Sequence, residues 1–235
     1  MVRAEQESFR VPTAAAPSPK PAGGYRKGGE ARQRILESAL AVFAAAGFKG
    51  ATTRQIAEQA GVNLPALKYY FGGKEGLYLA CAQEILSRYQ TGMLGLVAGA
   101  QAALQADLGP DQARALLKRV LQTLADMLVG GGEAEVWSAF MLREIGEQGP
   151  AFDLLYAQLW APGVEVTAGL IARALGEPAA SPAARIQALL LISSLSAFGT
   201  ARPVALKFLA WPDAKAERMA QIKAALDAQI DRLGR

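Results

Sequence analysis

The segment TTRQIAEQAGVNLPALKYYFGGKEGLY, residues 52–78, places two short helical patterns on either side of a tight turn. Thr52 stands directly before the first pattern and Asn63 directly before the second, where side-chain oxygens cap helix N-termini. Gly61 lies in the turn between them. This arrangement matches the helix-turn-helix unit, whose second helix enters the major groove of DNA. Any helical hairpin also needs a small residue and a turn glycine, so the hairpin pattern alone leaves the function open.

Apolar residues recur at helical spacing along the whole chain, and runs of β-branched residues are almost absent. The sequence therefore predicts an all-α protein. A helix over residues 30–46 ends at Gly47, the hairpin follows, and a longer helix starts at Lys74 and covers residues 74–90. Glycine and proline then separate further helices, expected at 94–106, 111–129, 133–147, 151–158, 162–175, 181–200, 203–210 and 214–233.

Positive charge is concentrated in the first third of the chain. Residues 1–80 hold eleven Lys and Arg against six Asp and Glu, a net of 11 − 6 = +5, and residues 81–235 hold fourteen against fifteen, a net of 14 − 15 = −1. This distribution suits a polyanion partner at the N-terminal end, although an ordinary solvated face has the same composition. Residues 1–28 contain few large apolar groups, so we expect a flexible basic arm that is either a passive tail or a DNA contact.

The chain contains no histidine and one cysteine, Cys81. It thus lacks the commonest general base and zinc ligand, and one cysteine cannot form a disulfide within the chain. We expect no catalytic site, no metal site and no cofactor, and we expect Cys81 to be a buried thiol on an apolar helix face. The N-terminus lacks the apolar core of a signal peptide, and the uncharged stretch 186–201 is short for a membrane span. A cytoplasmic protein without a membrane partner is expected.

Three motifs, TTRQIAEQAGV, ALKYYF and KEGLY, resemble the signature of the TetR family of transcriptional regulators. The resemblance covers residues 30–80 and includes the paired threonines, the aromatic run that ends in Phe71, and Lys74 followed by Glu75. A shorter likeness, in LREIGEQGPAFDLLY, points to the branch typified by the CecR regulator.

The resemblance implies an N-terminal three-helix DNA-binding domain at residues 29–76, with the helix-turn-helix at about 52–71, and a C-terminal helical effector-binding and dimerisation domain at 77–235. It also implies three partners: double-stranded DNA with a palindromic operator, a small-molecule effector, and a second copy bound through the last long helices. Independently, ARIQALLLISSLSAFGTARPVALKFL is apolar nearly all round, as a helix buried on two sides would be. The central helix of a monomer has the same pattern.

The resemblance assigns roles at the DNA site as well. The first hairpin helix opens with Thr52 and Thr53, where a helix N-terminus favours a phosphate, and Arg54 comes next, within reach of a guanine edge or a phosphate. The groove-facing positions of the second helix are Asn63, Leu64, Pro65, Ala66 and Lys68. The positions that contact the DNA backbone or brace the helix are Tyr69 and Tyr70, and the start of the next helix contacts a phosphate through Lys74.

Four positions depart from residues common in the family: Asn63 replaces Ser, Pro65 replaces Gly, Lys68 replaces Tyr and Tyr70 replaces His. These changes keep the docking mode but leave the operator sequence undetermined. Lys68 and Arg54 are the best placed to read hydrogen-bonding base edges, since the side chains between Asn63 and Leu67 offer only apolar contacts. For Tyr70, core packing is favoured over direct DNA contact.

Large side chains cluster in the middle helices, where the family has its effector pocket. The predicted pocket residues are Trp137, Phe140, Met141, Glu144, Phe152, Tyr156 and Trp160, with Arg143, Gln148 and Gln158 as further polar candidates. Ligand pockets are mostly apolar with a few polar groups that fix orientation. Aromatic residues at helical spacing also build ordinary cores, so both interpretations stay open here.

The sequence therefore indicates a ligand-responsive DNA-binding regulator, a repressor released from its operator by a small, largely apolar molecule. An activator or a dual regulator would have the same sequence features. Two other classes are a helical enzyme, for which no catalytic constellation is present, and an anion-binding adaptor, which would bind all DNA sequences equally.

Overall fold

The computed structural model describes residues 23–106, 108–129, 133–199, 201–212 and 216–234. Every regular element in these ranges is helical, which confirms the all-α prediction. In chain order the elements are α1 (Gly23–Gly50), α2 (Thr53–Gln59), α3 (Leu64–Phe71), α4 (Lys74–Gln105), α5 (Pro110–Val129), α6 (Glu133–Glu147), α7 (Phe152–Leu155), the π-helix η1 (Tyr156–Trp160), α8 (Ala161–Ala174), α9 (Pro182–Gly199), α10 (Arg202–Phe208) and α11 (Ala216–Asp231). Residues 1–22 of the expected arm lie outside the described residues.

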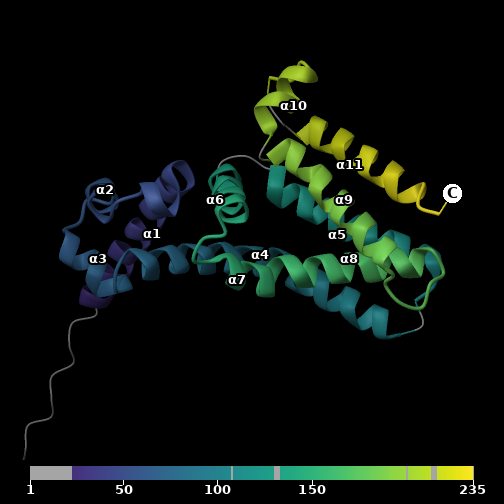
Figure 1. Cartoon of the computed structure of the whole chain (residues 1–235), viewed down its shortest axis with the longest axis horizontal. Coiled ribbons are helices and arrows are strands. Elements are labelled where there is room, and N and C mark those ends of the chain that lie inside the picture. Colours follow the sequence, from purple (N-terminus) through teal and green to yellow (C-terminus); the bar gives the residue numbers. More distant parts are fainter. Residues whose placement is uncertain (1–22, 107, 130–132, 200, 213–215, 235) are drawn as a thin grey trace, which may run out of the picture.

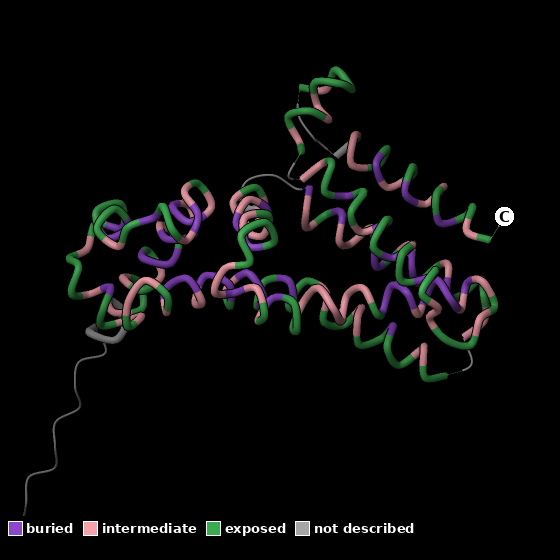
Figure 2. The backbone as a smooth tube through the Cα atoms, in the orientation of Figure 1, coloured by how far each residue is buried: buried purple, intermediate pink, exposed green. Residues whose placement is uncertain are grey.

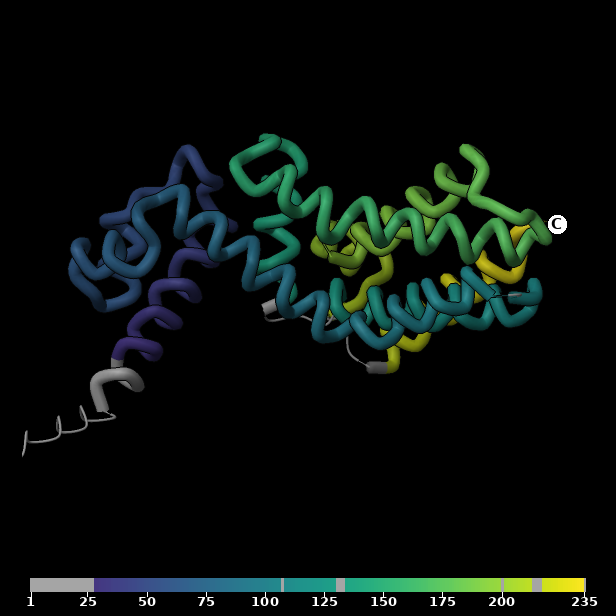
Figure 3. Tube along the Cα trace, turned by 90° about the horizontal axis from the view of Figure 1, so that it is seen from below, coloured from purple at the N-terminus to yellow at the C-terminus, as the bar shows by residue number. Residues whose placement is uncertain are grey.

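The molecule is elongated, with α1, α2 and α3 at one end and the bundle of α5, α8, α9 and α11 at the other (Figure 1). Helix α4 starts beside α3 and runs into the bundle, and the view from below shows the same course (Figure 3). We expected two helices, at 74–90 and 94–106, but α4 is one helix of 32 residues. Glycine inside a helix costs only ~1 kcal/mol relative to alanine, and packing on both ends of α4 outweighs that cost.

The end of the first helix is confirmed at Gly47, although the helix begins at Gly23, earlier than expected. Gly47 has φ 70° and ψ 177°, which interrupts the helical path inside α1. The positive φ favours glycine at this position, and a Cβ here would lie 2.8 Å from Oε1 of Glu147, the mobile end of a side chain on α6. The N-terminal helices and α6 therefore contact one another at the end of the first helix.

The break expected between the helices at 151–158 and 162–175 is wrong, because α7, η1 and α8 follow one another without interruption. Pro162 has no N–H, and its ring clashes with the carbonyl one turn earlier in an α-helix. The chain absorbs this with a π-turn, in which the N–H of Ala161 donates to the carbonyl of Tyr156, five residues back. A proline that reads as a helix stop is therefore accommodated inside a longer helical segment.

One hydrophobic core joins the N-terminal helices to the middle of the chain. The Tyr78 ring lies edge-on to Phe43, with centroids 4.8 Å apart, and tilted against Phe140 at 4.7 Å. Phe48 makes a second edge contact with the same ring at 5.1 Å. Residues from α1, α2, α3, α4, α6 and α7 contribute to this core. The expected domain boundary after residue 76 is therefore crossed both by α4 and by a shared core.

Cys81 is fully buried in this core, as predicted for a structural thiol. Its Sγ lies 4.0 Å from the carbonyl oxygen of Leu36. Burial raises the pKa of the Cys81 thiol, which disfavours the reactive thiolate. A second core fills the bundle between α4, α5, α8, α9 and α11.

Helix α9 is not buried on all sides within one chain. Its inner face holds four buried residues, Ala184, Ala188, Leu191 and Leu195. Ile186, Leu189 and Leu190 remain at least half exposed, and Figure 2 shows this alternation along the helix. By length and mean hydropathy α9 also passes as a membrane-span candidate, with 22% of it buried. The expectation of a helix buried on two sides is therefore met on one side only, and the other side is free apolar surface.

Candidate nucleic-acid interface

The two hairpin helices begin at the predicted caps. The Thr52 hydroxyl oxygen accepts a hydrogen bond from the backbone N–H of Gln55 at 3.2 Å. Oδ1 of Asn63 accepts from the N–H of Ala66 at 3.0 Å. Each bond pairs one of the N–H groups that a helix start leaves free. Gly61, with φ 64°, makes the turn between the helices.

The inner face of the hairpin fixes its orientation on α1. Ile56 and Leu67 are almost fully buried, and Ala57 and Ala60 are buried on the same side of the hairpin sequence pattern. Both helices contact α1, and α3 also contacts the start of α4. A helix shorter than about ten residues is marginal in water, so this packing rather than intrinsic propensity holds α2 and α3.

The outer face carries most of the predicted DNA-binding residues. The exposed ones are Thr52, Arg54, Asn63, Leu64, Pro65, Lys68 and Tyr69, while Thr53 and Ala66 are half-buried. Tyr69 is 83% exposed, which is unusual for an aromatic side chain in a folded monomer. Positions 64, 65, 68 and 69 repeat at helical spacing and so share one face of α3. The residues lie together on a surface that a groove can cover.

Tyr70 and Phe71 face the other way and brace the hairpin, as favoured for Tyr70 from the sequence. Both are half-buried against the N-terminal core. The Tyr70 ring contacts Tyr69 edge-on at 5.1 Å and Phe71 at 6.4 Å. The Arg32 guanidinium lies 5.2 Å above the Phe71 ring, which ties α3 to α1 through a cation–π contact.

Lys74 is held at the end of α1 in this structure. Its ammonium donates to the backbone carbonyl of Lys49 at 3.4 Å and lies 4.8 Å from the centre of the Phe48 ring. The ammonium has three N–H donors, so its bond to the carbonyl leaves two for another acceptor. The phosphate role of Lys74 stays a prediction.

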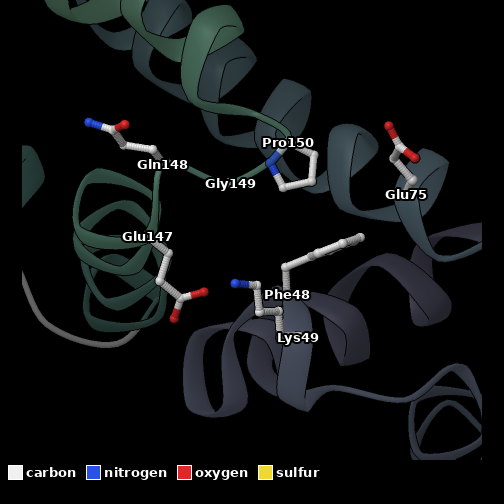
Figure 4. Close-up of a pocket in the computed structure, with 7 residues that line it drawn as sticks. All are labelled: Phe48, Lys49, Glu75, Glu147, Gln148, Gly149 and Pro150. Carbon is white, nitrogen blue, oxygen red and sulfur yellow. The ribbon is translucent and has the colours of Figure 1, made fainter.

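A cleft of about 430 Å³ opens between the end of α1 and the turn after α6 (Figure 4). Lys49 and Glu147 face one another across it. Its lining residues are Phe48, Lys49, Glu75, Glu147, Gln148, Gly149 and Pro150. Of these the sequence had singled out only Gln148 as a pocket candidate, because the two walls are distant along the chain. A second cleft, on α10, is lined by Pro203, Val204, Lys207 and Phe208.

The predicted effector residues fall into two groups, and neither lines these two clefts. Trp137, Phe140, Met141 and Glu144 lie on α6, with Phe140 and Glu144 fully buried in the N-terminal core. Phe152, Tyr156 and Trp160 form a ladder along α7 and η1, with the Phe152 ring 6.3 Å from Tyr156 and 5.5 Å from Trp160. Tyr156 is 54% exposed. Trp137 of the first group is half-buried, as are Phe152 and Trp160 of the second, so both groups keep some aromatic surface open to a ligand.

Glu144 already has a partner for each carboxylate oxygen. Oε2 accepts from the Tyr78 hydroxyl at 2.5 Å, and Oε1 accepts from the N–H of Ala151 at 2.7 Å. Burial and the Glu144 carboxylate raise the pKa of Tyr78, so its hydroxyl stays a donor. Glu144 therefore joins α4, α6 and the start of α7 here, a role that its position in the sequence did not reveal. Among the described residues no group of three or more His, Cys, Asp or Glu could hold a metal ion.

A capped helix-turn-helix with an exposed polar face, joined to a helical body, defines the class of DNA-binding transcriptional regulators. Comparison with known proteins agrees. Residues 35–81 match the family described as "Bacterial regulatory proteins, tetR family", and residues 113–235 match the "HTH-type transcriptional dual regulator CecR, C-terminal domain". The HTH-type transcriptional dual regulator CecR of Shigella flexneri is 32% identical over 207 residues, which cover 87% of this chain and 92% of that protein.

Solved structures show the same fold at lower identity. A TetR-like transcriptional regulator from Rhodococcus sp. RHA1 superposes with a TM-score of 0.59 at 22% identity, over 85% of this chain and 94% of that one. AibR in complex with isovaleryl coenzyme A and operator DNA superposes with a TM-score of 0.57 at 15% identity, over 85% and 97%. The chain belongs to the TetR family of bacterial transcriptional regulators, and its C-terminal region matches the CecR branch. The relatives are regulators and not enzymes.

Substitutions at Asn63 can separate its capping bond, which the structure shows, from its predicted contact with DNA. Asn63→Asp keeps a good cap, so the free energy of unfolding should stay within about 0.5 kcal/mol of wild type, whereas Asn63→Ala should lose ~0.5–2 kcal/mol. The added carboxylate should nevertheless repel DNA phosphates and weaken binding at least about tenfold. Denaturant unfolding measures the change in stability. Fluorescence anisotropy, with an operator fragment selected from genomic DNA, measures the change in DNA affinity. Unchanged DNA affinity of Asn63→Asp would remove Asn63 from the interface.

Proposed function

We propose that the protein is a ligand-responsive repressor that binds a palindromic operator as a homodimer in the cytoplasm. The observation that carries this proposal is the exposed face of α2 and α3, where Arg54, Asn63 and Lys68 stand over a buried apolar face. A helix face that is packed on one side and presents cations and a tyrosine on the other suits a groove lined by phosphates.

Each predicted contact has a physical role in this proposal. The α2 N-terminus with Thr52 and Thr53 binds a phosphate, because its free N–H groups and helix dipole favour an anion. Arg54 and Lys68 read base edges, at ~1–3 kcal/mol of discrimination for each good contact. Phosphate contacts fix the register on the duplex, and base contacts supply the sequence preference.

Repression is the primary mode proposed, and dual regulation is the second candidate. The printed name of the Shigella flexneri relative describes it as a dual regulator. The DNA-facing residues are equally compatible with both modes, since the sign of regulation depends on where the operator lies relative to the promoter.

Removal of the cations predicted to contact base edges, Arg54 and Lys68, should weaken operator discrimination while the fold is kept. For Lys68→Ala and Arg54→Ala we expect the ratio of operator to random-DNA affinity to fall by about tenfold each, since one base contact is worth ~1–3 kcal/mol. Arg119→Ala, which removes an exposed cation from α5, is the matched control. Gel shifts on operator fragments selected from genomic DNA measure the ratio. Binding that is equal on all sequences would favour a non-specific anion-binding adaptor instead.

The proposed dimer uses the exposed apolar face of α9. Ile186, Leu189 and Leu190 are each at least half exposed, although burial of such side chains is worth ~1.5–3 kcal/mol apiece. A two-fold operator requires two copies, and a second α9 packed on this face would cover it.

Leu190→Glu should therefore convert the protein to a monomer, because it places a charge at the centre of the covered face. Leu94→Glu, at a comparably exposed leucine on α4, should leave the dimer intact. Light scattering after size exclusion gives the mass of each variant. A Leu190→Glu protein that stays dimeric would place the interface elsewhere.

The proposed effector is a small, largely apolar molecule that binds near the aromatic ladder of Phe152, Tyr156 and Trp160. The π-turn brings Phe152 and Trp160 onto one side, and Tyr156 is partly exposed next to them. A π-turn inside an α-helix frequently occurs at functional sites. The neighbouring structure of AibR contains isovaleryl coenzyme A, which makes acyl thioesters the first probes to test.

Isovaleryl coenzyme A should raise the melting temperature, and free coenzyme A should not, if the apolar part of the ligand provides the binding energy. Tyr156→Ala should reduce the shift with little cost in stability, because the side chain is 54% exposed. Phe208→Ala, at an 87% exposed aromatic on α10, is the matched control. Equal shifts for Tyr156→Ala and wild type would place the effector away from the ladder.

A further inference from the structure

Arg143 on α6 holds the end of the first helix. Its Nε donates to the carbonyl oxygen of Ala44 at 2.7 Å, and one terminal nitrogen donates to the carbonyl oxygen of Ala45. The other terminal nitrogen lies 3.5 Å from Oε1 of Glu147, one turn further along α6. One side chain thus bridges two segments that are almost one hundred residues apart in the sequence.

Arg143 binds α1 at the end of its helical path, where backbone carbonyl groups lack partners within the helix. The helical path ends at Gly47, and the last carbonyls of a helix have no partner within the helix. A cation at that end is favoured by the helix dipole, and the planar guanidinium offers two N–H directions at once. A lysine ammonium at position 143 would keep the charge and lose this fork.

The same turn of α6 is fixed on its other side. Glu144 accepts hydrogen bonds from the Tyr78 hydroxyl on α4 and from the N–H of Ala151 at the start of α7. The last turn of α6 is therefore a junction: Arg143 holds α1, and Glu144 holds α4 and α7. Movement of α1 relative to α6 must change the Arg143 contacts, since these hydrogen bonds join the two helices, whereas Glu144 bonds to α4 and to the start of α7.

Orientation at this junction contributes to where α3 points, together with the contacts of α1 and α3 with α4. Helices α2 and α3 pack on α1, so a rotation of α1 against α6 also moves the exposed face of α2 and α3 that is proposed to contact DNA. In a dimer the DNA-contacting faces of the two α3 helices must enter successive major grooves, about 34–36 Å apart. A rotation of α1 against α6 by a few degrees would change the distance between the α3 helices of the two copies. The effect is enlarged because α2 and α3 lie at the far end of the elongated molecule (Figure 1).

We propose that Arg143 is a positioning residue that sets the operator half-site spacing, by fixing the angle between α1 and α6. The inference rests on the proposed function, since it needs a dimer on two half-sites. Arg143 touches no DNA in this scheme. It acts through α1, and it alters which spacing is accepted and not which bases are read.

The test compares operators that differ only in the number of base pairs between the half-sites. Wild type should prefer one spacing over spacings two base pairs shorter or longer. Arg143→Ala should reduce that preference by roughly fivefold, because two charge-assisted hydrogen bonds no longer hold the angle. Arg143→Lys should fall between the two, and Arg119→Ala should match wild type. The discrimination between correct and mutated half-site bases should stay unchanged in Arg143→Ala.

Three results would overturn the inference. The first is an unchanged spacing preference in Arg143→Ala. The second is an equal loss of affinity at every spacing, which would indicate a general loss of fold or dimer. The third is a wild-type protein that distinguishes operator from random DNA but tolerates all spacings. A wild type that does not distinguish operator from random DNA would refute the proposed function itself.

A measurement without DNA tests directly whether the Arg143 hydrogen bonds fix the angle between α1 and α6. A spin label at the exposed position of Gln55→Cys in both copies reports the distance between the two hairpins, and the buried Cys81 should not react with the label. The distance distribution should be broader in Arg143→Ala than in wild type and Arg119→Ala. Equal widths would show that the angle is fixed without Arg143 and would contradict the proposal.

Discussion

The Tyr78 side chain connects the parts of this protein on which DNA recognition depends. Its ring packs against Phe43 and Phe48 from α1 and against Phe140 from α6, and its hydroxyl donates to the buried Glu144 carboxylate. A buried carboxylate is tolerated only with such partners, so the hydrogen bond and the ring packing support one another. Through this contact the DNA-binding helices and the body share a core, and a change in the body can reach the hairpin.

Signals that act over one or two turns of helix were predicted correctly. Thr52 and Asn63 cap the hairpin helices, and Gly47 interrupts the first helix, because a cap or a left-handed glycine depends on the nearest backbone groups only. The split of α2 and α3 into a buried and an exposed face follows in the same way from helical periodicity. Local physics was sufficient for these features.

Features that depend on packing between distant segments were missed. Helix α4 continues through its glycines because tertiary packing outweighs a local cost of ~1 kcal/mol each, and a π-turn accommodates Pro162 without ending the helical segment. The predicted pocket shows the same limit. Phe140 and Glu144 were grouped with Tyr156 for their residue types, but the structure puts the first two in a core and leaves the third half exposed. Periodicity does not tell which neighbour a buried face meets.

The sequence by itself determined that the chain is helical, where the hairpin lies and which of its side chains face outward, since these follow from the period of the helix and from caps. Only the tertiary structure decided that Arg143 holds the end of α1, that Glu144 is consumed by Tyr78 and Ala151, and that α9 keeps an open apolar face. The Arg143 and Tyr78 bonds join residues 99 and 66 positions apart, and the α9 face is a surface that its own chain leaves uncovered. The spacing of neighbouring residues encodes neither kind of feature.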